Sequence, residues 1–163
     1  MRVERKKKGS ASEQGLGRSR GGFTSKILVS AVDEDTAIAV NIVPGQDHDA
    51  PHLNAMLDQA AERVPDMEQV VGDKGFDGEP QRTACKNHGA TPVIPYKSNS
   101  TKAGRLNKKA YRARNGIERL FGKLKEFRRI ATRYEKLKQT FLGLVHLALG
   151  FIRAKRTVIV NTA

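Results

Sequence analysis

The chain has 163 residues, of which 38% are hydrophobic and 29% are charged, and this suits one globular domain better than a disordered chain. Its formal net charge of +13 favours a polyanionic partner such as nucleic acid. The single cysteine excludes an intrachain disulfide, and since the chain has neither an apolar stretch of about 18 residues nor an apolar leader, we expect a cytoplasmic protein with no membrane span.

The basic residues are concentrated in two segments that flank an acidic middle. Residues 1–26 hold eight basic and two acidic side chains, whereas residues 27–101 hold five basic and twelve acidic ones. Residues 102–138 return to fourteen basic and three acidic side chains. A generic basic RNA-binding protein is disfavoured by the acidic middle and by the few aromatic residues available for stacking.

The first elements expected along the chain are a basic lead-in and a β-hairpin. Residues 1–25 are polar and rich in Gly and Ser, so we expect a flexible lead-in with ordered structure from about Lys26. Two apolar, β-branched runs follow at 27–32 and 37–43. The acidic residues 33–35 between them predict a turn, and together these features predict a hairpin.

Helices and short strands are then expected to alternate. Apolar residues at helical spacing predict a helix over 50–64, with Asp49 as its N-cap. The pattern next predicts a short buried strand around 70–73, a modest helix over 79–88 and a strand over 91–96.

The last third of the chain is predicted to be helical. We expect a helical region from about residue 108 to residue 156, broken near 134–136, with an apolar last part that packs on the sheet. The order β-β-α-β-α-β-α-α indicates an α/β fold with one mixed sheet. The domain is expected to span residues 26–156, followed by a tail over 157–163.

Asp73 is the first candidate for chemistry because it ends a predicted buried strand. Ligands of open α/β sheets bind beyond the carboxyl ends of strands, and a carboxylate placed there can reach a metal ion. The alternative is that Asp73 only caps the next turn, as Asp often does.

Glu118 is the second candidate and lies in a basic segment with helical periodicity. At about 100° per residue, a helix places four residues on one narrow stripe next to the core-facing stripe: Tyr111, Arg114, Glu118 and Lys125. An ordinary ion pair on a solvated face would explain the same pattern. Together with Asp73, the stripe favours carboxylates that hold a divalent cation, with Arg and Lys nearby to bind a DNA backbone.

The spacing of these four residues resembles the signature around the last catalytic acid of bacterial insertion-sequence transposases of the Asp-Asp-Glu (DDE) class. That signature is Tyr, two residues, Arg, three residues, Glu, six residues, Lys. Other segments resemble further motifs of the family, and these are residues 17–26, 45–49, 73–77 and 127–136. The likeness covers about residues 15–155 and is closest to the insertion-sequence families numbered four and five.

The resemblance implies a ribonuclease-H-like fold that cuts and joins DNA with two Mg²⁺ ions, for which Mn²⁺ can substitute. It implies that Asp73 and Glu118 are the second and third catalytic acids and the metal ligands. It also implies a set of DNA-binding residues: Tyr111, Arg114, Lys125, Arg18, Arg20 and Lys74. Water would first cleave a phosphodiester at the transposon end, and the freed 3′-hydroxyl would then attack target DNA.

One part of the family's pattern has no counterpart before the hairpin. The family's first strand carries the first catalytic Asp, but the only acids in that region are Glu4 and Glu13, outside any predicted strand, and Asp33 belongs to the hairpin turn. We therefore expect the first strand to be missing and to be supplied by an upstream transposase segment, as in elements joined by frameshifting. The alternative is a catalytically inactive truncated fragment that binds DNA or regulates the full-length transposase. The active complex is expected to be a homo-oligomer on transposon ends and target DNA, associated with the bacterial nucleoid.

Overall fold

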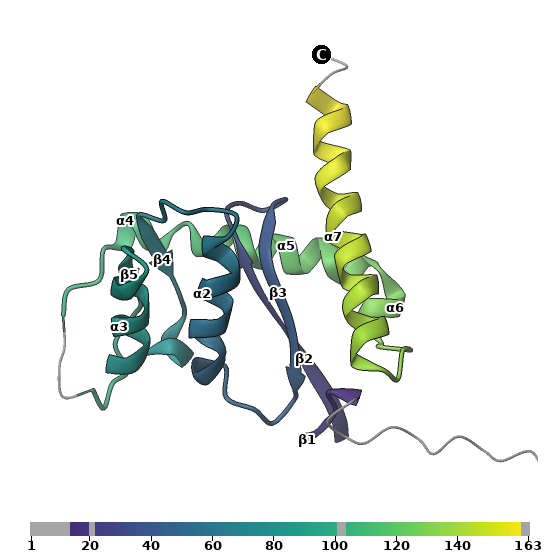
Figure 1. The fold of residues 1–163 in the computed structure, drawn as a ribbon, viewed down its shortest axis with the longest axis horizontal. Helices are drawn as coiled ribbons and strands as arrows, with labels where there is room; N and C mark the ends of the chain where they lie inside the picture. The colour runs from purple at the N-terminus through teal and green to yellow at the C-terminus, as the bar shows by residue number, and fades with distance from the viewer. Residues whose placement is uncertain (1–13, 20–21, 101–103, 161–163) are drawn as a thin grey trace, which may run out of the picture.

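The computed structural model describes residues 14–19, 22–100 and 104–160 as a mixed α/β protein (Figure 1). The expected α/β class is therefore confirmed. In chain order the elements are β1 Gly17–Ser19, β2 Gly22–Ala31, β3 Ala37–Pro44, the 3-10 turn η1 Ala50–His52, α2 Leu53–Ala61, β4 Gln69–Val71, the 3-10 turn η2 Lys74–Phe76, α3 Glu79–Asn87, β5 Thr91–Val93, α4 Lys108–Tyr111, α5 Arg114–Glu126, α6 Arg128–Ala131 and α7 Lys138–Val160.

Strands β2 and β3 form the antiparallel hairpin that the two apolar runs predict. The connection closes with a hydrogen bond from the Val32 N–H to the Thr36 carbonyl at 2.9 Å. The Asp33 carboxylate accepts the backbone N–H groups of Asp35 and Thr36, each at 2.8 Å. Asp is favoured in such turns because its short side chain can satisfy the backbone in this way.

Strand β1 shows that ordered structure begins earlier than the sequence suggests. It pairs antiparallel with the start of β2, with Arg18 opposite Phe23. Gly22 has φ +103°, a conformation that glycine adopts without a steric penalty and that lets the chain reverse. The expectation of order only from about Lys26 is wrong, since β2 begins four residues earlier. Residues 1–13 of the predicted lead-in lie outside the described range.

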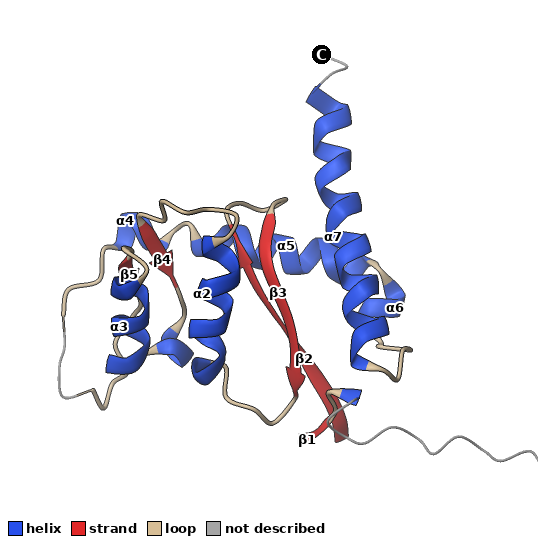
Figure 2. Ribbon diagram, in the orientation of Figure 1, coloured by secondary structure: helices blue, strands red, loops and turns tan. Residues whose placement is uncertain are grey.

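The described strands form two sheets rather than one. The first has the order β1-β2-β3 and is antiparallel, and the second is the parallel pair β4-β5. Helix α2 runs between the two strand groups (Figure 2). It packs Met56 and Ala60 against Ala39 of β3, and Leu53 and Leu57 against α3 and the second sheet. The described residues build no strand between β2 and β4, so the strands do not join into one mixed sheet, and the expected absence of the first strand predicts such a gap.

Helices α5, α6 and α7 cover the other face of the hairpin. Val40 and Ile42 of β3 contribute to this core, together with Leu120, Leu124 and Val145. The predicted long helix is broken at more places than expected: between α4 and α5, at Phe127, and between α6 and α7. Helix α7 continues to Val160, which is beyond the expected end near residue 156, and its last turns project from the rest of the fold (Figure 1).

The predicted helix over 50–64 is present but shorter. Its α-helical part ends at Ala61, and Asp49 does not cap the start with its side chain. The Asp49 carboxylate instead accepts a hydrogen bond from Lys26 Nζ at 3.0 Å, so an ion pair replaces the expected cap. No helix in the described part of the chain is long and apolar enough to cross a bilayer.

Candidate active site

Asp73 lies where the sequence predicts it, just beyond the carboxyl end of β4. It is the N-cap of η2, and its Oδ1 accepts the Gly75 N–H at 2.7 Å. The capping role is therefore real, but it occupies only one carboxylate oxygen. Oδ2 has no partner among the described residues, so it is available to a cation.

Asp77, the other acid of the same motif, is committed to structure. Its side chain is only 7% exposed and forms an ion pair with Arg82 at 2.8 Å. The backbone N–H of Lys97 and the Arg82 guanidinium hold the pKa of Asp77 below its ordinary value. The Arg82 guanidinium also lies 3.9 Å from the centre of the Tyr96 ring, so this cluster ties α3 to the chain after β5. Asp77 is thus a poor candidate for metal binding.

Glu118 lies on α5 at the edge of the buried face, as predicted. Leu120 and Leu124 of the core-facing stripe are 0% and 1% exposed, which confirms the predicted orientation of this helix. Glu118 itself is 54% exposed and pairs with Arg114 one turn earlier through its Oε1. Its Oε2 has no protein partner within the described residues.

Tyr111 is not on the same helix as Glu118, so the predicted single stripe is wrong at this residue. Tyr111 ends α4, and a tight turn at 112–113 separates it from α5. Within this turn the Ala113 N–H bonds to the Ala110 carbonyl at 3.1 Å, a spacing of three residues that winds the chain more tightly than an α-helix. Arg114, Glu118 and Lys125 remain together on α5.

The other predicted DNA-binding residues are dispersed. Lys74 is exposed in η2 next to Asp73, and Arg18 is exposed on β1 at the far end of the hairpin strands from their turn. Arg20 lies outside the described residues. The structure thus brings Arg114 and Glu118 into contact, but it shows no contact between Asp73 and Glu118. Their joint action on one cation stays a prediction.

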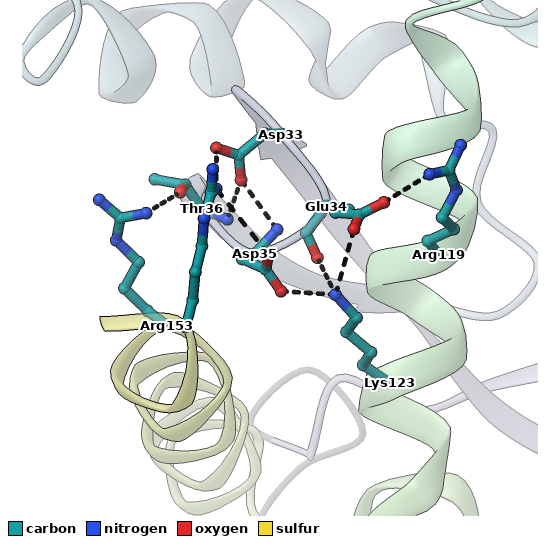
Figure 3. A network of polar contacts seen from close by, with 8 residues as sticks. Asp33, Glu34, Asp35, Thr36, Arg119, Lys123 and Arg153 are labelled. Atoms are coloured by element: carbon teal, nitrogen blue, oxygen red, sulfur yellow. Dashed lines mark hydrogen bonds and ion pairs between the residues drawn. The ribbon is translucent and has the colours of Figure 1, made fainter. Parts of the chain in front are cut away.

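Helix α5 also has a polar edge on the other side of its core-facing stripe from Glu118. This second edge binds the acidic turn of the hairpin (Figure 3). Arg119 donates to Glu34 at 2.7 Å, and Lys123 Nζ lies 2.5 Å from Asp35 Oδ1. We did not predict these contacts from the sequence. The available signal was the complementarity between a turn of three consecutive acids and a helix with an excess of cations.

Helix α7 contacts the same turn from the side opposite to α5. Arg156 donates to Asp33 at 2.7 Å and Arg153 donates to the Thr36 hydroxyl at 2.9 Å (Figure 3). Partial burial raises the pKa of Asp33, but hydrogen bonds from Asp35, Thr36 and Arg156 outweigh it and lower this pKa to about 2. Asp33 is therefore a structural acid, which agrees with its expected place in the turn.

The two edges of α5 have different consequences for catalysis. Arg119 and Lys123 are engaged by the hairpin turn, whereas Glu118 and Lys125 lie on the opposite side of the core-facing stripe. Among the described residues no group of three or more His, Cys, Asp or Glu is arranged to hold a metal ion. The described site thus offers two separate carboxylates, each with one available oxygen and with a cation nearby.

Comparison with known families identifies the family of the chain. Residues 1–150 match the model of the family described as "Transposase DDE domain". The chain belongs to this transposase family. DDE transposases cut DNA and join DNA strands during transposition, and they generally use divalent metal ions, so DNA is the substrate of this transposase domain.

A relative supports the same assignment. The protein named "Putative transposase for insertion sequence element IS6501", from Brucella ovis (strain ATCC 25840 / 63/290 / NCTC 10512), is 30% identical over 116 residues. The aligned part covers 71% of this chain and 86% of that relative. No solved structure matches the chain.

Proposed function

We propose that Asp73 and Glu118 together bind Mg²⁺ ions and that this site performs the cleavage and joining steps of transposition. The proposal rests on one observation, the positions and the hydrogen bonding of these two carboxylates. Each occupies the element expected for it and keeps one oxygen without a protein partner in the described part of the chain. Carboxylates buried in ion pairs, such as that of Asp77, lack this freedom.

The donor set fits a hard divalent cation. Mg²⁺ typically takes one or two protein carboxylates and completes its shell with water and phosphate oxygens. The family generally uses divalent ions, and we propose two Mg²⁺ ions, for which Mn²⁺ can substitute. When bound, such ions polarise the phosphodiester and lower the pKa of the attacking water or 3′-hydroxyl.

Neighbouring cations would position the DNA. Lys125 shares the outer edge of α5 with Glu118, and Lys74 directly follows Asp73, so each can bind a phosphate next to one acid. Arg114 already pairs with Glu118, but a guanidinium has five N–H donors and can hold a phosphate at the same time. Tyr111, Arg18 and Arg20 are also proposed to contact the DNA backbone.

We also propose that an additional strand completes the sheet. Residues 25–31 of β2 pair only with β3, and β4 pairs only with β5, so among the described strands both keep an unpaired edge. No residue of β2 is fully buried, whereas β3 has four buried side chains. A strand placed between β2 and β4 would pair with both and join the sheets into one mixed, ribonuclease-H-like sheet.

This strand would come from an upstream transposase segment and would carry the first catalytic Asp. A third acid would raise the affinity of the site for metal ions and fix them in the in-line geometry that phosphodiester attack needs. The complete protein would act as a homo-oligomer on transposon ends and target DNA in the bacterial cytoplasm.

A second candidate function is a catalytically inactive fragment that binds DNA or regulates the full-length transposase. It is favoured by one observation, the lack of a group of three or more metal-binding side chains in the part of the chain that the structure describes. Metal binding at Asp73 and Glu118 separates the two candidates, because a DNA-binding regulator has no need of it.

Paramagnetic NMR tests the proposed site on the 163-residue chain. Trace Mn²⁺ should broaden the amide signals around Asp73 and around Glu118 together, because one binding region serves both acids. Asp73→Asn should reduce the broadening at Glu118 as well, while the control Glu62→Gln, an exposed acid at the end of α2, should change neither. Broadening at Glu118 that is unaffected by Asp73→Asn would show that the two acids do not share a site.

A further inference from the structure

The loop between α6 and α7 is fixed to the N-terminal part of the described chain by Arg133. Arg133 has φ 47°, which is unusual for a residue with a side chain. Its guanidinium donates to the Gly15 carbonyl at 3.3 Å and also to the Gln14 carbonyl, and it lies 4.9 Å from the centre of the Phe141 ring. These contacts bring the loop to the same end of the molecule as β1.

Glu135 fixes the other side of the same loop. Its side chain is only 8% exposed and forms an ion pair with Arg129 at 2.7 Å. Tyr134 lies between these two anchored residues and is 63% exposed. The loop therefore presents an aromatic ring to solvent while both neighbours of that ring point into the protein.

A second exposed aromatic lies at this end of the fold. Phe23 is 73% exposed and lies directly opposite Arg18 in the β1–β2 pair, so the two side chains share one face. Residues 14 and 15, to which Arg133 donates, lie just before β1, with one residue between them and the strand. We call Arg18, Phe23, Arg128, Tyr134 and Lys136 the basic aromatic end.

The basic aromatic end has an excess of available positive charge. Arg18, Arg128 and Lys136 are exposed and have no acidic partner among the described residues. Glu135, the acid of the loop, is neutralised by Arg129. The acids beside the start of the hairpin also have partners, since Asp49 pairs with Lys26 and Asp47 lies 3.5 Å from His52 Nε2.

We propose that the basic aromatic end is a second DNA-binding surface, separate from Asp73 and Glu118, in which Tyr134 stacks on an unpaired base. The inference rests on the proposed function in that it takes DNA as the ligand. Cations that hold phosphates beside an exposed aromatic ring are the combination used to bind single-stranded nucleic acid. A protein partner fits less well, since the centre of a protein interface is depleted in charged residues, whereas three of these five residues carry a positive charge without an acidic partner among the described residues.

Fluorescence anisotropy without divalent metal tests this surface independently of catalysis. The probes are one duplex, the same duplex with a short single-stranded gap, and a single strand. Tyr134→Ala should weaken binding to the gapped and single-stranded probes by roughly 5- to 100-fold and should affect the intact duplex little, while Tyr134→Phe keeps the ring and should bind like the wild type. Because Tyr134 is exposed, the folding of both variants can be checked by circular dichroism.

Substitution of single cations on this surface gives a second test of the proposal. Lys136→Gln and Arg128→Gln should each lower the salt slope of binding by roughly 1, whereas Lys86→Gln, an exposed cation on α3, should leave the slope unchanged. Equal binding of all probes by wild type and Tyr134→Ala would overturn the proposal. It would also be overturned if Tyr134→Ala and Phe23→Ala altered sedimentation of the protein but not its affinity for DNA. Loss of metal binding at Asp73 would bear only on the proposed function.

Discussion

At the scale of single residues, the cations of α5 differ in what they can do. Arg119 and Lys123 are occupied by the hairpin turn, Arg114 is shared with Glu118, and Lys125 has no acidic partner among the described residues. The spacing on a helix predicted that Arg114, Glu118 and Lys125 would share one edge. The partners of the opposite edge were not predicted, because they come from residues about 85 positions away and only their complementary charge pointed to them.

The first prediction concerns DNA affinity. Arg114→Gln and Lys125→Gln should each lower the slope of log affinity against log salt by roughly 1, since each removes a phosphate contact. Anisotropy titrations with a duplex at several salt concentrations measure the slope, and Lys86→Gln on α3 is the control of equal charge. Affinity that does not change with salt would show that the basic helix is not the binding surface.

The second prediction concerns His88, which links α3 to α2. Its ring bonds to the Ala84 carbonyl and to Asp58, each at 2.9 Å, and these contacts raise the pKa of His88. A raised pKa means that the stabilisation is fully present below the unfolded pKa of about 6.5 and is lost as the pH rises through the folded value. His88→Gln should therefore lower the free energy of unfolding more at pH 5.5 than at pH 9, as measured with urea. Equal losses at both pH values would contradict the assignment.

At the scale of elements, the sequence predicted the helices and strands that depend on the spacing of apolar residues and on turn residues. The hairpin, α2, α3 and the core-facing stripe of α5 follow from apolar periodicity and turn residues, and all are present. The start of β2 was missed because Gly22 and its neighbours look like a flexible segment, although β1 pairs with them. The breaks at 112–113 and at Phe127 were not predicted, because helical periodicity in the sequence continues across them.

The third prediction compares two ion pairs of the hairpin turn. The pair of Lys123 with Asp35 is partly shielded, with Asp35 14% exposed, whereas Arg119 and Glu34 are 62% and 37% exposed. A double-mutant cycle with Lys123→Met and Asp35→Asn should give a coupling of about 1 kcal/mol, against less than about 0.5 kcal/mol for the exposed pair. Urea unfolding of the variants measures both couplings. A larger coupling for Arg119 with Glu34 would mean that burial does not determine which contact holds the turn.

The fourth prediction concerns the core under α5. Leu120 is fully buried between the hairpin and α7, so Leu120→Ala should lower the free energy of unfolding by about 2–5 kcal/mol. Leu147→Ala provides a matched control, because the same deletion at a side chain 71% exposed on α7 should cost little. Equal losses in the two variants would show that α5 does not pack as described.

At the scale of the whole molecule, the described strands form two separate sheets, and a gap in the sheet is what the expected loss of the first strand predicts. Sequence patterns identified the α/β class and placed Asp73 and Glu118 on their elements, but a periodic pattern cannot show which strands pair. That depends on whether a strand lies between β2 and β4, and the described residues provide none. The proposed strand that carries the first Asp would account both for the separation of the sheets and for a site with only two acids.

The fifth prediction follows from this explanation. The 163-residue chain alone should not cleave DNA at a useful rate in Mg²⁺, because two carboxylates hold the ions less firmly than three. A nicking assay on DNA with the element's own ends tests this. Robust cleavage by the chain alone would show that another acid within it completes the site.

The same nicking assay on the chain extended with the upstream segment, by fusion or as a separate polypeptide, tests the assignment of the two acids directly. We expect Mg²⁺-dependent cleavage by the extended protein, reduced to background by Asp73→Asn and by Glu118→Gln and retained by Glu62→Gln. Cleavage at the wild-type rate by the Asp73→Asn or the Glu118→Gln variant would contradict the central claim that these two residues are catalytic acids of this transposase.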